Sequence, residues 1–238
     1  MENVFQLWVY LSASPLLWLT VTLGAYLLAE TIARAARYAA LANPVLIAVA
    51  LVALLLHLTR TAYPTYFAGA QFVHFLLGPA TVALAVPLVR EAARVRRLIL
   101  PVLAALAAGS TTAIVTAMGV AWALGATPEV VVSLAPKSVT TPIAMGIAAA
   151  NGGVPALTAV FVLMNGVIRG ISVTPLMNLL RVRDYTARGF AAGLASHAIG
   201  TARAFQVNRL AGTFAGLALA LNGLATSLLV PLILALWR

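Results

Sequence analysis

The only lysine of the chain, Lys137, lies inside an apolar segment, in the run Leu-Ala-Pro-Lys-Ser-Val-Thr-Thr-Pro-Ile-Ala-Met at 134–145. A lysine at the centre of a bilayer costs roughly 2.5–3.5 kcal/mol on insertion scales, and it is tolerated where it faces water, an anion or backbone carbonyls. Pro136 and Pro142 lack a backbone N–H and break the helix around it. Irregular backbone at this depth requires protein or water around it, so the run predicts a polar cavity.

Hydroxyl groups surround this lysine and complete a cradle that could bind a carboxylate. Backbone N–H groups at the start of a half-helix after the break would favour an anion, and Lys137 would add a full positive charge. The alternative is that the lysine snorkels to the nearer interface while the hydroxyls bond carbonyls of their own helix. The residues that we expect at this site are Lys137, Ser138, Thr140 and Thr141.

A second polar interruption, Gly-Leu-Ala-Ser-His-Ala-Ile-Gly-Thr-Ala-Arg-Ala at 193–204, lies in another apolar segment. Small residues allow helices to approach closely, and Gly200 permits a bend. His197 could bind an anion, carry a proton coupled to transport, or be a packed structural residue. From this segment we expect substrate contacts by Ser196, His197, Thr201 and Arg203.

Catalysis and metal binding are not expected. Ser196 and His197 are neighbours, which point about 100° apart on a helix. None of the five acidic residues is near enough in sequence to orient the histidine as a base. With no cysteine and three scattered histidines, the chain also offers no obvious metal or cofactor site. The two polar segments contain Lys137, His197 and Arg203 but no acidic residue, so we expect the bound solute to be an anion and not a cation.

The overall composition predicts a membrane protein. Hydrophobic residues make up 63% of the chain and charged residues 8%, whereas soluble domains are about a quarter charged. The net charge of +10 would suggest nucleic acid in a soluble protein, but no basic patch interleaved with exposed aromatics supports that partner. No linker interrupts the apolar pattern, so we expect one transmembrane domain over residues 1–238.

The fold class expected is all-α, a polytopic membrane helix bundle of about seven to eight transmembrane segments with interrupted or re-entrant helices. A helix needs about 20 apolar residues to cross the hydrocarbon core. The N-terminus lacks the features of a cleaved signal, so the first run should stay in the protein. Apolar runs lie at 14–33, 43–59, 66–89, 98–126, 154–180 and 210–237, and the two broken segments at 130–150 and 185–205.

The arginines test the topology, because short cytoplasmic loops are enriched in Lys and Arg. If all eight segments cross, seven loop arginines lie inside and five outside; if 130–150 is a re-entrant hairpin, the numbers become ten and two. The hairpin, with the N-terminus outside and the C-terminus inside, is therefore favoured. The spans within 43–126 would then run opposite to those within 154–237, as in the inverted repeats of transporters. The basic loop at 90–97 should contact the anionic surface of the lipid bilayer.

Five ordered runs resemble the LrgB/CidB/YohK family over nearly the whole chain. They are Asn-Pro-Val-Leu-Ile at 43–47, Phe-Leu-Leu-Gly-Pro-Ala-Thr-Val-Ala-Leu-Ala-Val-Pro-Leu at 75–88, Pro-Lys-Ser-Val-Thr-Thr-Pro-Ile-Ala-Met at 136–145, Pro-Ala-Leu-Thr-Ala-Val-Phe at 155–161 and Ala-Ser-His-Ala-Ile-Gly-Thr-Ala-Arg-Ala at 195–204. The resemblance implies a bacterial inner-membrane protein, often encoded with a small LrgA/CidA-like membrane partner.

The resemblance implies two functions from different classes. One is an antiholin-like or holin-like regulator of murein hydrolase activity and cell lysis; the other is a carrier, as in plastid relatives that translocate glycolate and glycerate and bacterial pairs linked to pyruvate. The two interrupted polar helices favour the carrier, since a midplane site with broken backbone is a transporter feature. We therefore expect alternating-access transport of a small monocarboxylate such as pyruvate, lactate, glycolate or glycerate. A homo-oligomer is also expected, because Asn165 and Arg169 need polar partners.

Overall fold

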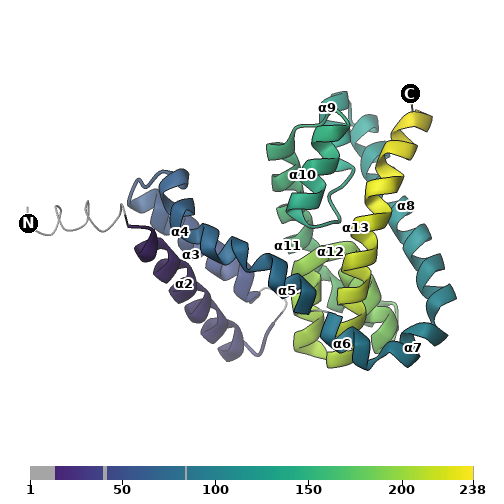
Figure 1. Cartoon of the computed structure of the whole chain (residues 1–238), viewed down its shortest axis with the longest axis horizontal. Coiled ribbons are helices and arrows are strands. Elements are labelled where there is room, and N and C mark those ends of the chain that lie inside the picture. Colours follow the sequence, from purple (N-terminus) through teal and green to yellow (C-terminus); the bar gives the residue numbers. More distant parts are fainter. Residues whose placement is uncertain (1–13, 40–41, 84, 238) are drawn as a thin grey trace, which may run out of the picture. The chain divides into compact units, whose positions relative to one another are not determined.

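The structure is a computed structural model that describes residues 14–39, 42–83 and 85–237. Every regular element in this part of the chain is a helix, which confirms the expected fold class (Figure 1). The expectations on the N-terminus and on Arg238 lie outside the described residues. Among the described residues, four helices are long and apolar enough to cross a membrane: α2 (Pro15–Ala35), α8 (Ile99–Ala123), α11 (Pro155–Leu179) and α13 (Arg209–Trp237). The chain divides into two compact units, residues 1–83 and 84–238.

The first unit packs α2 against α3 (Pro44–Leu58) and α4 (Tyr63–Phe75), followed by the short α5 (Leu77–Ala83). Gly69 of α4 allows the close approach, because a Cβ there would lie 2.1 Å from the carbonyl oxygen of Pro15. The prediction of one continuous span at 66–89 is wrong. The chain there forms α4, α5 and, in the second unit, α6 (Ala85–Arg90), with Leu84 outside the described residues. Pro79 explains the break between α4 and α5, because a proline ring clashes with the carbonyl four residues earlier.

In the second unit, α9 (Pro128–Leu134) and α10 (Thr141–Ala150) form a helical hairpin, which we call hairpin 1. The chain then comes back to the first arm: the N–H of Val154 donates to Ser133 Oγ at 2.7 Å, and Thr158 Oγ1 donates to the Ser133 carbonyl at 3.0 Å. Helix α11 thus begins beside the end of α9. The sequence predicts this reversal from the two prolines.

Helix α12 (Tyr185–Val207) is a second hairpin, which we call hairpin 2. Its backbone leaves the helical region at Ser196 (φ −123°, ψ 15°) and His197 (φ 42°, ψ −132°). The second arm folds back on the first, since a Cβ on Gly200 would lie 2.4 Å from the carbonyl oxygen of Ala192. The expected crossing at 185–205 is therefore wrong, because sequence periodicity does not distinguish a straight helix from two antiparallel arms of the same composition.

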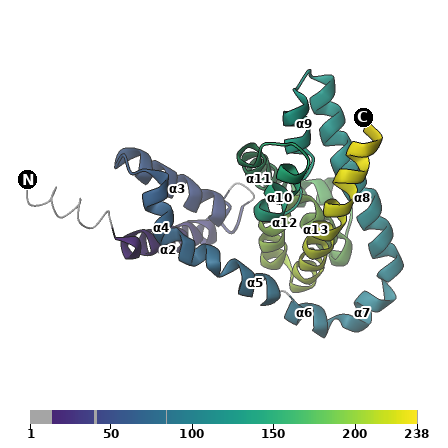
Figure 2. The ribbon, with the colours of Figure 1, turned by 45° about the horizontal axis from the view of Figure 1, so that its top comes forward.

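The two hairpins enter the second unit from opposite ends. Figure 1 shows α9 and α10 in its upper half and α12 in its lower half, and Figure 2 shows the same bundle from another side. Each hairpin has its own apolar core. One cluster joins hairpin 1 to α8, α11 and the end of α13, and includes Met118, Val139 and Val230. The other joins hairpin 2 to the start of α8 and of α13, and includes Phe190 and Phe214.

A shift of 57 positions relates hairpin 1 and α11 to hairpin 2 and α13. It brings the N-cap Thr127 onto the N-cap Asp184 and the end of α10 onto the end of α12. It also superposes Asn165-Gly166 on Asn222-Gly223. The unit is thus an inverted repeat, but of hairpin plus long helix rather than the expected pairing of 43–126 with 154–237.

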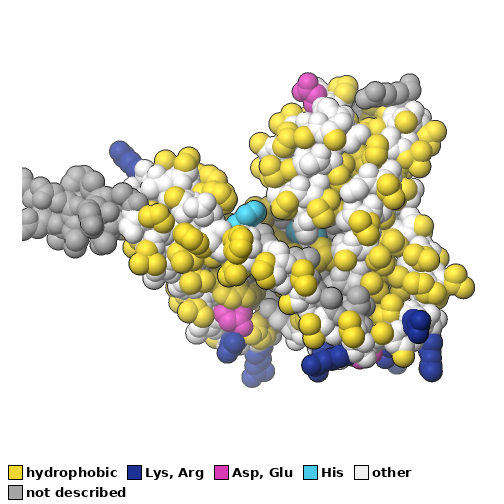
Figure 3. Space-filling view, in the orientation of Figure 1, with side chains coloured by type: hydrophobic (Ala, Val, Ile, Leu, Met, Phe, Trp, Pro, Cys, Tyr) yellow, Lys and Arg dark blue, Asp and Glu magenta, His cyan; other side chains and the backbone are white. Residues whose placement is uncertain are grey.

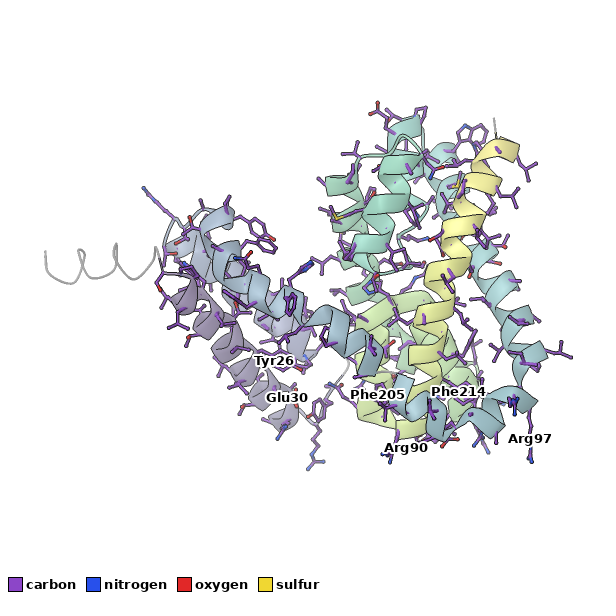
Figure 4. The ribbon with its side chains drawn as sticks, in the orientation of Figure 1. Tyr26, Glu30, Arg90, Arg97, Phe205 and Phe214 are labelled. Atoms are coloured by element: carbon purple, nitrogen blue, oxygen red, sulfur yellow. The ribbon has the colours of Figure 1, made fainter. Side chains whose placement is uncertain are left out.

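Charge separates the two ends of the second unit. Lys and Arg side chains gather at its lower end and an acidic side chain lies at its upper end (Figure 3). Arg90 and Arg97 lie at the lower end with Phe214 (Figure 4), and Arg94 of α7 (Ala92–Arg97) interacts electrostatically with Asp184. We call the lower end, which carries Arg90, Arg94 and Arg97, the arginine-rich end. Large apolar side chains, such as Leu100 (76% exposed) and Leu228 (74% exposed), cover the outer faces, which is where lipid would contact the bundle.

Candidate functional site

The tips of the two hairpins meet inside the second unit, and two asparagines join them. On α11, Asn165 Nδ2 donates to the Lys137 carbonyl at 3.2 Å and to the Ala195 carbonyl at 3.0 Å. One amide nitrogen thus holds hairpin 1 and hairpin 2 together. Asn165 is buried, so both bonds are shielded from solvent.

Asn222 makes the equivalent pair of bonds from α13. Its Nδ2 donates to the Ser138 carbonyl at 3.1 Å and to the Leu194 carbonyl at 3.0 Å. Its Oδ1 accepts from Ser110 Oγ at 2.7 Å and from Thr226 Oγ1 at 3.2 Å. Each asparagine lies 28 residues after the carbonyl that it binds in its own repeat, so the inverted repeat extends to individual hydrogen bonds.

These bonds leave the junction electrostatically suited to an anion. The asparagines satisfy carbonyls near the ends of the entering arms, where a helix carries partial negative charge. The returning arms, α10 and the second half of α12, begin at the tips and direct their N-termini there. A helix N-terminus carries partial positive charge and unpaired N–H groups. The broken backbone therefore presents donors to the junction while its acceptors are occupied.

Lys137 adds full positive charge at the tip of hairpin 1. Its Nζ donates to the Ala113 carbonyl of α8 at 2.8 Å, so the lysine points into the bundle. Arg169 lies one turn after Asn165 on α11 and adds a second cationic side chain near this asparagine. No acidic residue occurs between Glu129 and Asp184 or after Asp184. Glu129 lies in the first turn of α9 and Asp184 at the N-cap of α12, and among the described residues no ion pair joins a carboxylate to either cation.

Two serines at the tips are buried without a hydrogen-bond partner in the described part of the chain. Ser138 is 5% exposed and Ser196 0%, and the hydroxyl of each is unpaired. Buried polar groups are nearly always satisfied, so such hydroxyls indicate a bound water, ion or ligand. Thr140 and Thr141 are half-buried at the start of α10. Thr140 is the N-cap of this helix, but its side chain makes no capping hydrogen bond.

His197 is built into hairpin 2. Its ring Nε2 lies 3.1 Å from the Val162 carbonyl, and a Cβ on Gly166 would lie 2.5 Å from the same nitrogen. Its positive φ is a strained conformation for a residue with a side chain. Thr201 Oγ1 donates to the His197 carbonyl at 2.9 Å. Both side chains therefore stabilise the turn of hairpin 2, which agrees with the structural alternative for His197.

Arg203 lies apart from the tips. It lines a cavity with Tyr185 and Arg188 near the base of hairpin 2, because the second arm carries it back toward the arginine-rich end. The structure thus brings Lys137, Ser138, Ser196 and His197 to one junction, with the threonines of α10 beside them, and separates Arg203 from that group.

Sequence reasoning missed Asn222 and Ser110 and assigned Asn165 and Arg169 no place in the site. A signal existed, since Asn-Gly occurs once in α11 and again 57 residues later in α13. An asparagine within an apolar span is expensive unless it is hydrogen-bonded. The repeat spacing becomes visible only when both segments are known to be hairpins.

The fold and junction define a class of protein: a helical membrane protein whose bundle contains two opposed helical hairpins. The sequence matches the model of the LrgB-like family over residues 22–236. The chain belongs to the LrgB-like family, which confirms the resemblance.

Relatives cover most of the chain. This chain is 35% identical over 196 residues to Uncharacterized protein YxaC of Bacillus subtilis (strain 168), and the match covers 82% of this chain and 85% of the relative. It is 34% identical to a protein of Haemophilus influenzae, over 80% of this chain and 83% of the relative. It is 29% identical to Antiholin-like protein LrgB of Bacillus mycoides, over 92% of this chain and 95% of the relative. No solved structure matches the chain.

Proposed function

We propose that the protein carries a small organic monocarboxylate across the bacterial inner membrane, with the hairpin junction as its binding site. The observation that carries this proposal is the meeting of two opposed hairpin tips beside Lys137 and Arg169, neither of which forms an ion pair with a carboxylate of the described residues. Ser138 and Ser196 would supply hydroxyl donors, and Thr140 and Thr141 further polar contacts. Pyruvate, lactate, glycolate and glycerate have the size and charge that such a small polar site would accept.

The inverted repeat supports an alternating-access mechanism. Each hairpin closes the junction from one end of the bundle, so releasing one tip while the other stays in place would expose the site to one side only. His197 and Thr201 would keep the turn of hairpin 2 in shape, and Arg203 would act outside the junction. The transport reaction requires no catalytic residue or cofactor.

The arginine-rich end would face the cytoplasm, following the enrichment of Lys and Arg on that side. The opposite end carries an edge-to-face pair of Trp122 and Trp237, with ring centroids 6.3 Å apart, as in an interfacial aromatic belt. The carboxyl end of α13 would then lie outside. This differs from the orientation expected from sequence, because hairpin 2 does not cross.

The second candidate is an antiholin-like role, and the relatives' names favour it. Several relatives are named Antiholin-like protein LrgB, and none of those quoted above is named for a carboxylate. In this role the protein would regulate murein hydrolase activity and lysis with an LrgA/CidA-like membrane partner or as a homo-oligomer. A protein that opens a lesion would pass unrelated solutes alike, whereas a carrier saturates and discriminates.

Uptake into proteoliposomes separates the two functions. The full chain is reconstituted and uptake of labelled pyruvate, lactate, glycolate and glycerate is measured over a concentration series, together with release of a trapped dye. A carrier gives saturable uptake, competition among the acids and no dye release. Lys137→Met, which keeps most of the length of the unbranched side chain but removes its charge, should reduce uptake at least tenfold, because charge-assisted hydrogen bonds contribute about 1.5–3 kcal/mol.

The matched control is Arg96→Gln, which removes an exposed positive charge from α7 at the arginine-rich end. It should leave uptake within about twofold of the parent protein, since screened surface charges contribute little. Equal loss in both variants would point to a general effect of charge and not to a site. Dye release without selective uptake would favour the antiholin-like function.

A further inference from the structure

A basic cavity lies between α11 and both arms of hairpin 2, away from the junction. Its volume is about 20 Å³, enough for a group the size of a water molecule or a few ligand oxygens but not for a whole organic acid. Arg188 comes from the first arm and Arg203 from the second, while Thr174 and Met177 come from α11.

The two arginines differ in how their donors are satisfied. Arg188 is engaged: it donates to Asn178 Oδ1 at 2.7 Å and to the Val182 carbonyl at 3.3 Å, near the end of α11. Arg203 donates to Gln206 Oε1 at 3.4 Å, a long bond between exposed groups. Its Nε is buried and has no partner in the described part of the chain. A buried guanidinium nitrogen without an acceptor is costly and indicates a missing one.

No carboxylate lines this cavity, so the missing acceptor is not supplied by the cavity itself. Asp184, the nearest acid in sequence, is occupied as the cap of α12 through the N–H groups of Thr186 and Ala187. The inverted repeat adds a comparison, because the positions equivalent to Arg188 and Arg203 in hairpin 1 are Val131 and Gly146. The charge is thus particular to hairpin 2 and is not needed to build a hairpin.

We propose that this cavity binds one oxyanion group, of phosphate or carboxylate type, between Arg203 and Arg188. Guanidinium groups suit such oxygens because they present several donors in a planar fork. Two sources share this chemistry: the phosphodiester of an anionic phospholipid, whose chains would lie along Val173 and Val207 at the edge of the cavity, and a free anion from solution. The bound anion would tie both arms of hairpin 2 to α11.

The experiment uses the full chain and measures both sources. In nanodiscs containing phosphatidylcholine and phosphatidylglycerol, native mass spectrometry of the released protein reports which lipid is retained. In neutral detergent, inorganic phosphate is titrated while thermal unfolding is followed. Arg203→Gln removes the charge, and Arg209→Gln is the control, because Arg209 is an exposed arginine near the same end of the bundle that does not line the cavity.

We expect the parent protein and Arg209→Gln to bind the anion and Arg203→Gln to bind it at least tenfold more weakly. Selective retention of phosphatidylglycerol would identify lipid as the source, and stabilisation by phosphate without lipid preference would identify a free anion. If Arg203→Gln does not fold, Arg203→Lys replaces it, since it keeps the charge but loses the Nε donor and should also bind more weakly. Equal binding by the parent and the Arg203 variant, or no binding by the parent, overturns the proposal.

Discussion

Replacing Asn222 by alanine tests whether the asparagine pair holds the two hairpins together. This side chain donates to the Ser138 and Leu194 carbonyls and accepts from Ser110 and Thr226. Alanine would remove all four bonds and leave two carbonyls and two hydroxyls to find new partners. Asn165→Ala removes only two donated bonds, so the two substitutions form a graded pair on equivalent positions of the repeat.

The expected magnitude follows from these counts. Interhelical hydrogen bonds in membrane proteins contribute about 0.6 kcal/mol on average and about 1.7 at most. Four bonds therefore give a loss of roughly 2–4 kcal/mol in the free energy of unfolding for Asn222→Ala, and two bonds give roughly 1–2 for Asn165→Ala. Because both side chains hold the same two tips, the double variant should cost less than the sum of the single variants.

Equilibrium unfolding in mixed detergent and dodecyl sulfate micelles measures these differences. The control is Asn151→Ala, since Asn151 Nδ2 donates to the Ile147 carbonyl four residues earlier and joins no two elements. It should cost less than about 1 kcal/mol. The reasoning is refuted if Asn222→Ala costs no more than Asn151→Ala, or if the order of Asn165 and Asn222 is reversed.

Three further predictions concern helix ends, packing and pH. Gly193→Ala should destabilise the protein by about 1–3 kcal/mol, because its Cβ would lie 2.0 Å from the Ala215 carbonyl oxygen. Gly146→Ala should be neutral or stabilising, because a Cβ there would have nothing within 4 Å. Equilibrium unfolding of both variants measures the two free energies. Asp184→Ala should lower the stability at neutral pH by about 1 kcal/mol through loss of the α12 cap. Hydrogen bonds from the Ala187 and Thr186 backbone, together with the charge of Arg94, lower the pKa of Asp184, so this contribution is present above the unfolded-state pKa of about 3.9 and lost as the pH falls through the lower folded-state pKa. The difference in the free energy of unfolding between the parent and Asp184→Ala, measured over a pH series, should therefore become smaller only at acidic pH. A difference that stays constant at acidic pH would contradict the cap assignment.

The sequence predicts much of this fold because a chain in a lipid bilayer must satisfy its backbone hydrogen bonds within itself, which favours helices in every apolar segment. Apolar length identifies the crossing helices, and Pro136 and Pro142 identify hairpin 1. Hairpin 2 could not be predicted in the same way, since its turn lies at Ser196 and His197 without a proline. A histidine at positive φ is a consequence of packing against α11, and neither propensity nor periodicity reports it.

The site was predicted by residue type more successfully than by arrangement. Lys137 and the tip serines attract attention as polar groups in apolar segments, and the structure brings them together. Arg203 attracts attention for the same reason but lies elsewhere, because the reversal of α12 changes the depth of every residue after His197. Asn222 was missed because a single amide in a long apolar helix resembles an ordinary interhelical contact.

The cross-repeat hydrogen bonds also affect how the protein is made. The Ser138 carbonyl is synthesised 84 residues before the Asn222 amide that binds it. Hairpin 1 is therefore synthesised before the Ser138 carbonyl has its hydrogen-bond donor, and the donor to the Lys137 carbonyl, Asn165, follows 28 residues later. Water or the translocation machinery must solvate these groups in the interval. Helix α13 carries Asn222, so hairpin 1 reaches its final hydrogen-bonded packing only after α13 has inserted.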